Sequence, residues 1–176
     1  MSIHGRVDFY INPSDMNRIG DTLTHFGANE ELIRVFKVSE VEFIVIGGLA
    51  VAWYCSDRQA DDMDLLVNPT PENSARISQA LNGLGLSGYS VASFTQPGLQ
   101  VRLKHTYYAE LLTPQKEGLT YSEVDKDAVD AKLFSIPIRL ASVASLIQMK
   151  EQAISSIGAQ REKHVKDIER LKQHVV

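Results

Sequence analysis

Two aspartates separated by one residue are the most chemically informative feature of this 176-residue sequence. Asp62 and Asp64 fall within 61–67, whose Met, Leu and Val residues are typical of a β-strand. Side chains two residues apart on a strand share a face, so these carboxylates should lie about 7 Å apart at ~3.3 Å per residue. Because the two negative charges repel each other, the pair favours a hard cation such as Mg²⁺, which prefers oxygen ligands.

A pair of adjacent glycines, Gly47 and Gly48, follows the apolar and β-branched segment 41–46. Glycines at a strand-to-helix turn expose backbone N–H groups and let a phosphate approach closely. Together with the aspartates, they indicate a site for a metal ion and a triphosphate. The alternatives are a simple tight turn at the glycines and solvated carboxylates on an edge strand at Asp62 and Asp64.

The elements that must position these residues alternate between helix and strand patterns, which predicts an α/β (α+β) fold with a mixed sheet flanked by helices. Asn29 is a plausible N-cap for a helix over 29–38, and Ser142 for one over 143–155. Other helices are expected over 49–55, 71–84 and 159–174, and strands over 41–46, 61–67, 89–94, 99–105, 107–112 and 136–140. We expect a loop over 113–124, followed by a partly helical segment to 134.

This pattern predicts an N-terminal arm over 1–28, a core over 29–140 and C-terminal helices over 141–176 that pack on the core. The chain carries 18 Lys and Arg residues against 22 Asp and Glu residues, a net charge of -4. That balance excludes a protein that coats nucleic acid by charge alone.

The rest of the composition predicts a cytoplasmic protein without a membrane partner. Cys55 is the single cysteine, so neither an intrachain disulfide nor a cysteine-based metal site can form. The longest uncharged stretch, 43–56, is shorter than the about 20 residues that span a bilayer, and no signal peptide is visible.

The sequence FIVIGGLAVAWYCSDRQADDMDLLV resembles the signature of the DNA polymerase β-like nucleotidyltransferase superfamily. The closer resemblance is to small bacterial nucleotidyltransferases, including those of toxin–antitoxin and abortive-infection systems. Three further features match: Arg58 before Asp-x-Asp, a late strand at 109–112, and a Leu-Ile-x-x-Lys motif at 146–150 within the helix expected over 143–155. The resemblance extends over about residues 29–172 and includes the segment REKHVKD at 161–167.

The resemblance implies transfer of a nucleoside monophosphate from an NTP such as ATP to a hydroxyl acceptor on a tRNA, a protein or a small molecule. It implies Mg²⁺ as cofactor, in a two-metal site whose ligands and catalytic residues are Asp62, Asp64 and Glu110. Gly47 and Gly48 would hold the triphosphate, with Arg58 and Lys150 as its charge partners. An antitoxin or a second copy of the chain is a further expected partner.

Two positions depart from the superfamily pattern. The third carboxylate is usually Asp, whereas this chain has Glu110, whose extra methylene moves its oxygens by a distance to which catalytic geometry is sensitive. His164 stands where Asp is usual, at a position that we expect to be peripheral. The alternative function is therefore a catalytically weakened, nucleotide-binding or regulatory module of the same fold. Separately from that function, the alternative for each of Glu110, Arg58 and Lys150 is a solvated surface charge.

Overall fold

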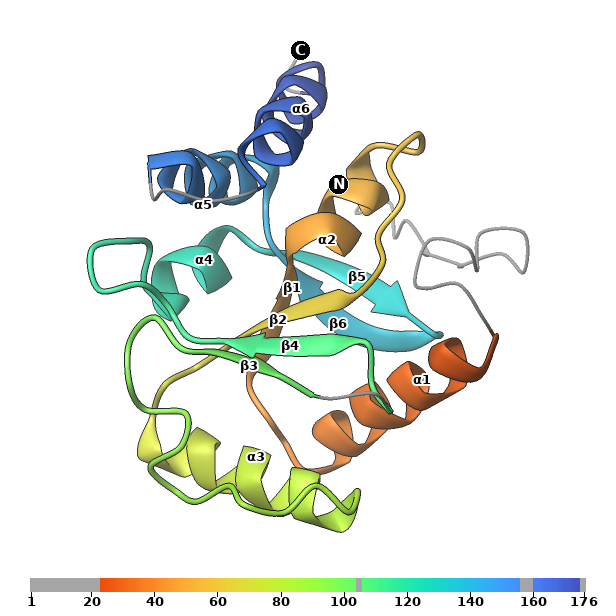
Figure 1. Ribbon diagram of the computed structural model, residues 1–176, viewed down its shortest axis with the longest axis vertical. Helices are drawn as coiled ribbons and strands as arrows, with labels where there is room; N and C mark the ends of the chain where they lie inside the picture. Colours follow the sequence, from red (N-terminus) through yellow and green to blue (C-terminus); the bar gives the residue numbers. More distant parts are fainter. Residues whose placement is uncertain (1–22, 104–105, 156–159, 175–176) are drawn as a thin grey trace, which may run out of the picture.

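The computed structural model describes residues 23–103, 106–155 and 160–174, which form a six-stranded mixed sheet covered by helices on both faces (Figure 1). The strand order is β3-β4-β2-β1-β6-β5. In chain order the elements are α1 (Leu23–Val38), β1 (Phe43–Ile46), α2 (Gly47–Tyr54), β2 (Met63–Val67), α3 (Pro71–Gly83), β3 (Gln100–Arg102), β4 (Ala109–Leu112), α4 (Tyr121–Asp127), β5 (Val129–Leu133), β6 (Ile136–Leu140), α5 (Val143–Ser155) and α6 (Arg161–Lys172). The predicted α/β fold class is confirmed.

The two central strands bring the motif residues together. All four residues of β1 are buried, and β1 runs antiparallel to β2 with Ile46 opposite Asp64. On its other side β2 runs parallel to β4, which pairs Asp64 with Glu110. The antiparallel β3–β4 pairing then sets Arg102 opposite Glu110. Residues distant in the sequence thus occupy neighbouring positions on one face of the sheet.

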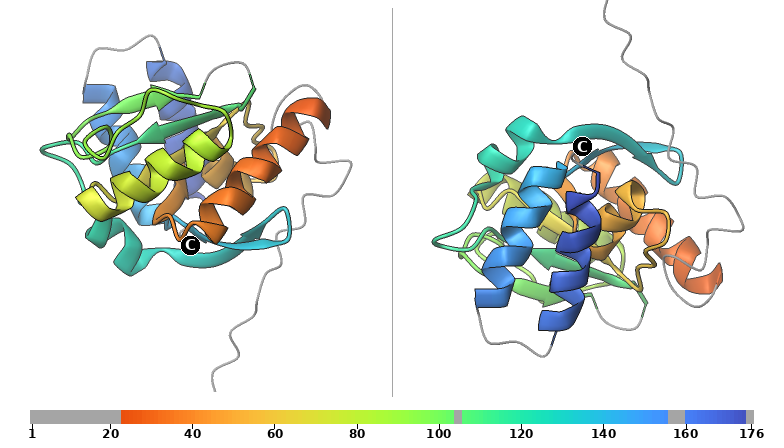
Figure 2. Two further views of the ribbon diagram at one scale, coloured as in Figure 1. Left: turned by 90° about the horizontal axis from the view of Figure 1, so that it is seen from below. Right: turned by 90° about the horizontal axis from the view of Figure 1, so that it is seen from above.

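The helices divide between the two faces of the sheet. The view from below in Figure 2 has α1 and α3 in front of the strands, whereas the view from above has α5 and α6 in front. The helices α5 and α6 pack on each other, and both contact α2. The helices α5 and α6 therefore lie on the same side of the sheet as α2, the helix that follows the diglycine turn. No described helix is long and apolar enough to span a membrane.

Of the two predicted N-caps, Ser142 is correct and Asn29 is wrong, whereas the cap at Thr70 was not predicted. Thr70 accepts a hydrogen bond from the Asn73 N–H at the start of α3, and Ser142 accepts one from the Ser145 N–H at the start of α5. The first helix begins at Leu23, so Asn29 is not its N-cap. Asn29 is instead fully buried, and its Oδ1 accepts the N–H of Tyr108 at 3.0 Å, just before β4. Residues 1–22 of the predicted arm lie outside the described residues.

The strand expected over 89–94 is a turn. Its hydroxyls satisfy the backbone locally, because Ser93 Oγ accepts the Ser90 N–H and the Ser93 N–H binds the Ser90 carbonyl. Ser74 Oγ then accepts the Phe94 N–H and ties the turn to α3. Side-chain acceptors of this kind compete with the ladder bonds of a sheet.

The segment 113–134 contains two elements that the sequence reading placed wrongly. The expected loop ends at α4, which begins with a capping box between Thr120 and Glu123. The expected partly helical segment is mostly β5, which forms a hairpin with β6. Phe134 and Ser135 turn that hairpin with φ of 54° and 63°, a conformation unusual for residues other than glycine.

Candidate active site

The diglycine turn fits closely against the second aspartate of the motif. Gly47 ends β1, begins α2 and has φ +68°, which favours glycine. A Cβ at this position would lie 2.0 Å from Asp64 Oδ2, closer than any side chain tolerates. The glycine therefore serves both the backbone conformation and the close approach of the carboxylate, and a simple tight turn does not explain it.

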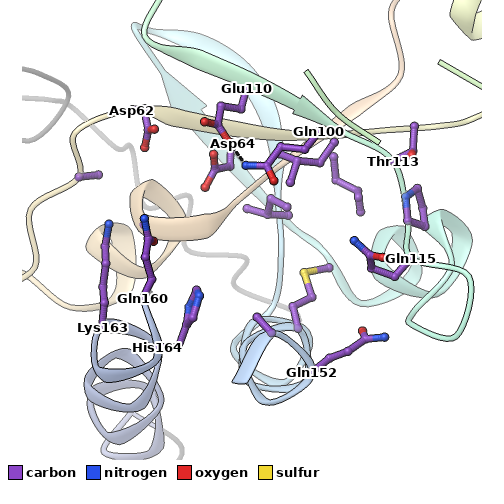
Figure 3. Close-up of a pocket in the computed structure, with 18 of the residues that line it drawn as sticks. Asp62, Asp64, Gln100, Glu110, Thr113, Gln115, Gln152, Gln160, Lys163 and His164 are labelled. Carbon is purple, nitrogen blue, oxygen red and sulfur yellow. Dashed lines mark hydrogen bonds between the residues drawn. The ribbon is translucent and has the colours of Figure 1, made fainter. Parts of the chain in front are cut away.

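Asp62, Asp64 and Glu110 line one pocket of about 630 Å³, together with Asp61. Figure 3 shows Asp62, Asp64 and Glu110 pointing into it from the sheet. Burial raises the pKa of Asp64 to about 7, with the negative charges of Asp62 and Glu110 adding to the effect. Burial, followed by the charge of Glu110, also raises the pKa of Asp62. Such mutual repulsion indicates a site for a cation.

Only one of the three carboxylates has a cationic partner within the described residues. Glu110 is buried and accepts hydrogen bonds from Arg102 Nε at 2.7 Å and from Gln100 Nε2. Asp62 and Asp64 form no ion pair with any described side chain. Their oxygens suit a hard cation, so Mg²⁺ binding by Asp62 and Asp64 stays a prediction. No group of three His, Cys, Asp or Glu side chains in the described ranges could hold a metal ion, so a metal role for Glu110 stays a prediction.

Arg58 and Lys150, the predicted charge partners of the triphosphate, both bind Asp167 of α6. Arg58 Nε lies 2.7 Å from Asp167 Oδ1, and Lys150 Nζ lies 2.8 Å from Oδ2. All three side chains are buried. Burial alone would raise the pKa of Asp167, but the hydrogen bonds from Arg58 and Lys150 hold it below its usual value. We name these three residues the buried charge cluster.

The two cations of the buried charge cluster differ in their access to the pocket. Arg58 lines the pocket, and its Nη2 would lie 3.0 Å from a Cβ built on Gly48. Lys150 is not among the residues that line it, although its positive charge lowers the pKa of Asp64. Arg58 therefore stands beside the diglycine turn, where the sequence predicted a phosphate contact, whereas Lys150 acts on the site only through its field.

The start of α6 contributes pocket residues to which the sequence reading gave no role in the site. Figure 3 shows Gln160, Lys163 and His164 on the pocket side of this helix, opposite the carboxylates. The positive charge of Lys163 lowers the pKa of both Asp62 and Asp64. His164 is not peripheral: it lines the pocket, and burial lowers its pKa. The spacing of Arg161 and Lys163 before Asp167 was the sequence signal that could have indicated a role for this helix in the site.

Comparisons with known proteins support the fold. No protein-family model matches the chain, and no curated protein matches it by sequence. Among solved structures, an antigenic nucleotidyltransferase-like protein from Paracoccidioides brasiliensis is similar, with a TM-score of 0.57 and 14% identity over 86% of this chain and 77% of that protein.

A second similar protein is ANT(2'')-Ia, an antibiotic-resistance factor. Its crystal structure in complex with adenylyl-2''-tobramycin has a TM-score of 0.55 and 14% identity over 87% of this chain and 90% of that protein. Its solution structure has a TM-score of 0.57, again at 14% identity, over 87% of this chain and 85% of that protein. The chain therefore has the fold of these nucleotidyltransferase-like proteins. None of them is described as a toxin or an antitoxin, so that role stays a prediction.

Proposed function

We propose that this protein is a nucleotidyltransferase that moves a nucleoside monophosphate from an NTP to a hydroxyl acceptor. The observation that carries the proposal is the packing of the Asp64 carboxylate against Gly47, with Asp62 and Glu110 beside it in one pocket. The acidic cluster and the bare backbone turn are the two features that a metal–triphosphate site needs. The nucleotidyltransferase-like fold of the similar structures supports the same activity.

The acidic and the basic residues of the pocket would have different roles in the reaction. Asp62 and Asp64 would hold Mg²⁺, which when bound neutralises charge on the phosphate oxygens. Lys163 and Arg58 would bind phosphate oxygens from the side of the pocket away from the sheet. The acceptor hydroxyl attacks the α-phosphorus, the bond from this atom to the bridging oxygen breaks, and pyrophosphate leaves. Glu110 would accept the proton of the hydroxyl, which requires its release from Arg102.

The test is nucleotide binding followed by transfer. The purified protein is incubated with each of the four labelled NTPs, Mg²⁺ and a cell extract that supplies tRNA, protein and small-molecule acceptors. We expect label transfer that an Asp62→Asn, Asp64→Asn double variant abolishes. The matched control is Asp127→Asn, because Asp127 is exposed at the end of α4 and does not line the pocket. Absence of both binding and transfer with every NTP would contradict the proposal.

A second candidate function is a nucleotide-binding module without turnover. The hydrogen bonds from Arg102 and Gln100 to both oxygens of Glu110 favour it, because a carboxylate held in this way is not free to take a proton. This module would bind NTP but transfer nothing. Glu110→Asp shortens the side chain away from Arg102, so a gain of transfer activity in this variant would indicate a weakened enzyme.

A further inference from the structure

The pocket has two chemically different ends. Every charged side chain that lines it comes from the loop between α2 and β2, the segment 61–64, β3, Glu110 or the start of α6. Along the same sheet face, Leu66 follows Asp64 by two residues and Leu112 follows Glu110 by two, so the floor changes from carboxylate to aliphatic within about 7 Å.

The apolar end is lined by uncharged residues from three separate parts of the fold. Met149 and Gln152 come from α5, and Gln115 and Leu119 come from the segment between β4 and α4. Figure 3 shows Gln115 and Gln152 on the side of the pocket away from Asp62 and Lys163. We name this end the neutral lobe, defined by the residues Leu66, Leu112, Gln115, Leu119, Met149 and Gln152.

Two glycines leave room for the amide groups of the neutral lobe. A Cβ on Gly118 would lie 2.5 Å from Gln152 Oε1, and a Cβ on Gly98 would lie 2.9 Å from Gln115 Oε1. Both separations are shorter than side-chain atoms tolerate. Each glutamine amide therefore rests against bare backbone, and a Cβ at either glycine would move it.

We propose that the neutral lobe binds the nucleobase of the NTP, with Gln115 and Gln152 hydrogen-bonding to its polar edge. This inference rests on the proposed function. A nucleotide is charged at one end and carries a neutral planar base at the other, and the pocket has the same polarity. The aliphatic side chains suit the apolar faces of a base, and an amide offers both a donor and an acceptor to its edge. A polycationic acceptor would need carboxylates, which this lobe lacks.

The experiment compares binding of whole nucleotides with binding of their phosphates alone. Dissociation constants for ATP, GTP, CTP, UTP and inorganic tripolyphosphate are measured by calorimetry with Mg²⁺. We expect Gln152→Ala to raise the Kd of the bound NTPs about 3- to 10-fold, the value of one lost hydrogen bond, and to leave tripolyphosphate binding unchanged. Gln148→Ala is the control, because Gln148 is exposed on the same helix and does not line the pocket.

A glycine substitution tests the same lobe without deleting a hydrogen-bonding group. Gly118→Ala moves the end of the Gln152 side chain, and we expect it to change the ratios of Kd among the four NTPs. Gly83→Ala is the control, since a Cβ there meets no atom within 4 Å. NTP binding that neither variant changes would overturn this inference alone, as would an equal loss of tripolyphosphate binding. Failure of the unsubstituted protein to bind any NTP would overturn the proposed function as well.

Discussion

Replacement of Asp64 by Asn should stabilise the protein in a pH-dependent way. Burial and neighbouring carboxylates raise the pKa of Asp64 from 3.8 to about 7, so the folded state retains a proton that the unfolded state has lost. The free energy of unfolding therefore decreases as pH rises from about 4 to about 7. The Asp64→Asn variant keeps the shape of the side chain and removes the charge, so this decrease should be absent.

The difference in pKa sets the size of the effect. A shift from 3.8 to about 7 corresponds to about 4 kcal/mol at about 1.4 kcal/mol for each pH unit. The variant should thus match the unsubstituted protein near pH 4 and become more stable by up to about 4 kcal/mol above pH 7.

Urea denaturation between pH 4 and pH 8.5, with a chelator to remove divalent cations, measures this difference. Asp127 provides the control, because it is exposed at the end of α4 and does not line the pocket, and Asp127→Asn should change the free energy of unfolding little at any pH. The measured quantity is the difference in free energy of unfolding between the Asp64→Asn variant and the unsubstituted protein. If this difference stays constant with pH, or decreases toward alkaline pH, the raised pKa of Asp64 is refuted.

Three other predictions follow from the same contacts. At pH 8, Mg²⁺ should raise the Tm of the unsubstituted protein and not that of the Asp64→Asn variant; an equal rise in both would place the cation elsewhere. Gly47→Ala should destabilise the fold by more than the about 1–2 kcal/mol of a left-handed backbone, because its Cβ overlaps the Asp64 carboxylate, and Gly83→Ala in urea denaturation is the control. Asp167→Asn should cost about 3–5 kcal/mol by leaving two buried cations without their carboxylate, whereas Glu162→Gln on the exposed side of α6 should change little.

The parts of the site that the sequence predicted are those set by local geometry. Asp64 lies on β2 and Asp62 precedes the strand by one residue, and both line the same pocket, the placement that the two-residue period of a strand predicts. The glycine pair indicates a special turn because only glycine adopts the backbone conformation of Gly47 at low cost. Local geometry could not predict that Glu110 lies beside Asp64, since β2 and β4 are separated by α3 and β3 in the sequence. That prediction came from the family resemblance.

The parts that sequence reasoning missed depend on how helices dock. The helical pattern of residues 159–174 does not indicate which part of the fold the helix packs against. Lys163 and His164 therefore had no assigned role in the site, although both line the pocket. The hairpin between β5 and β6 was hidden because Phe134 and Ser135, rather than glycine, turn it. The serines of the segment 89–94 bind its backbone, which no alternation of apolar residues reveals.

The buried charge cluster explains why three separate motif positions accompany the aspartates. Arg58 precedes β2, Lys150 lies on α5 and Asp167 lies on α6, yet all three meet at one carboxylate with no solvent exposure. The two cations exceed the single anion, so their net positive charge remains near the pocket, where it lowers the pKa of Asp64 through Lys150. Because Asp167 also fixes the register of α6, the same carboxylate positions Lys163 one turn earlier on the helix. The C-terminal helices are therefore part of the candidate site, and a fragment that ends before α5 would lose Lys163 from the charged end and Met149 and Gln152 from the neutral lobe.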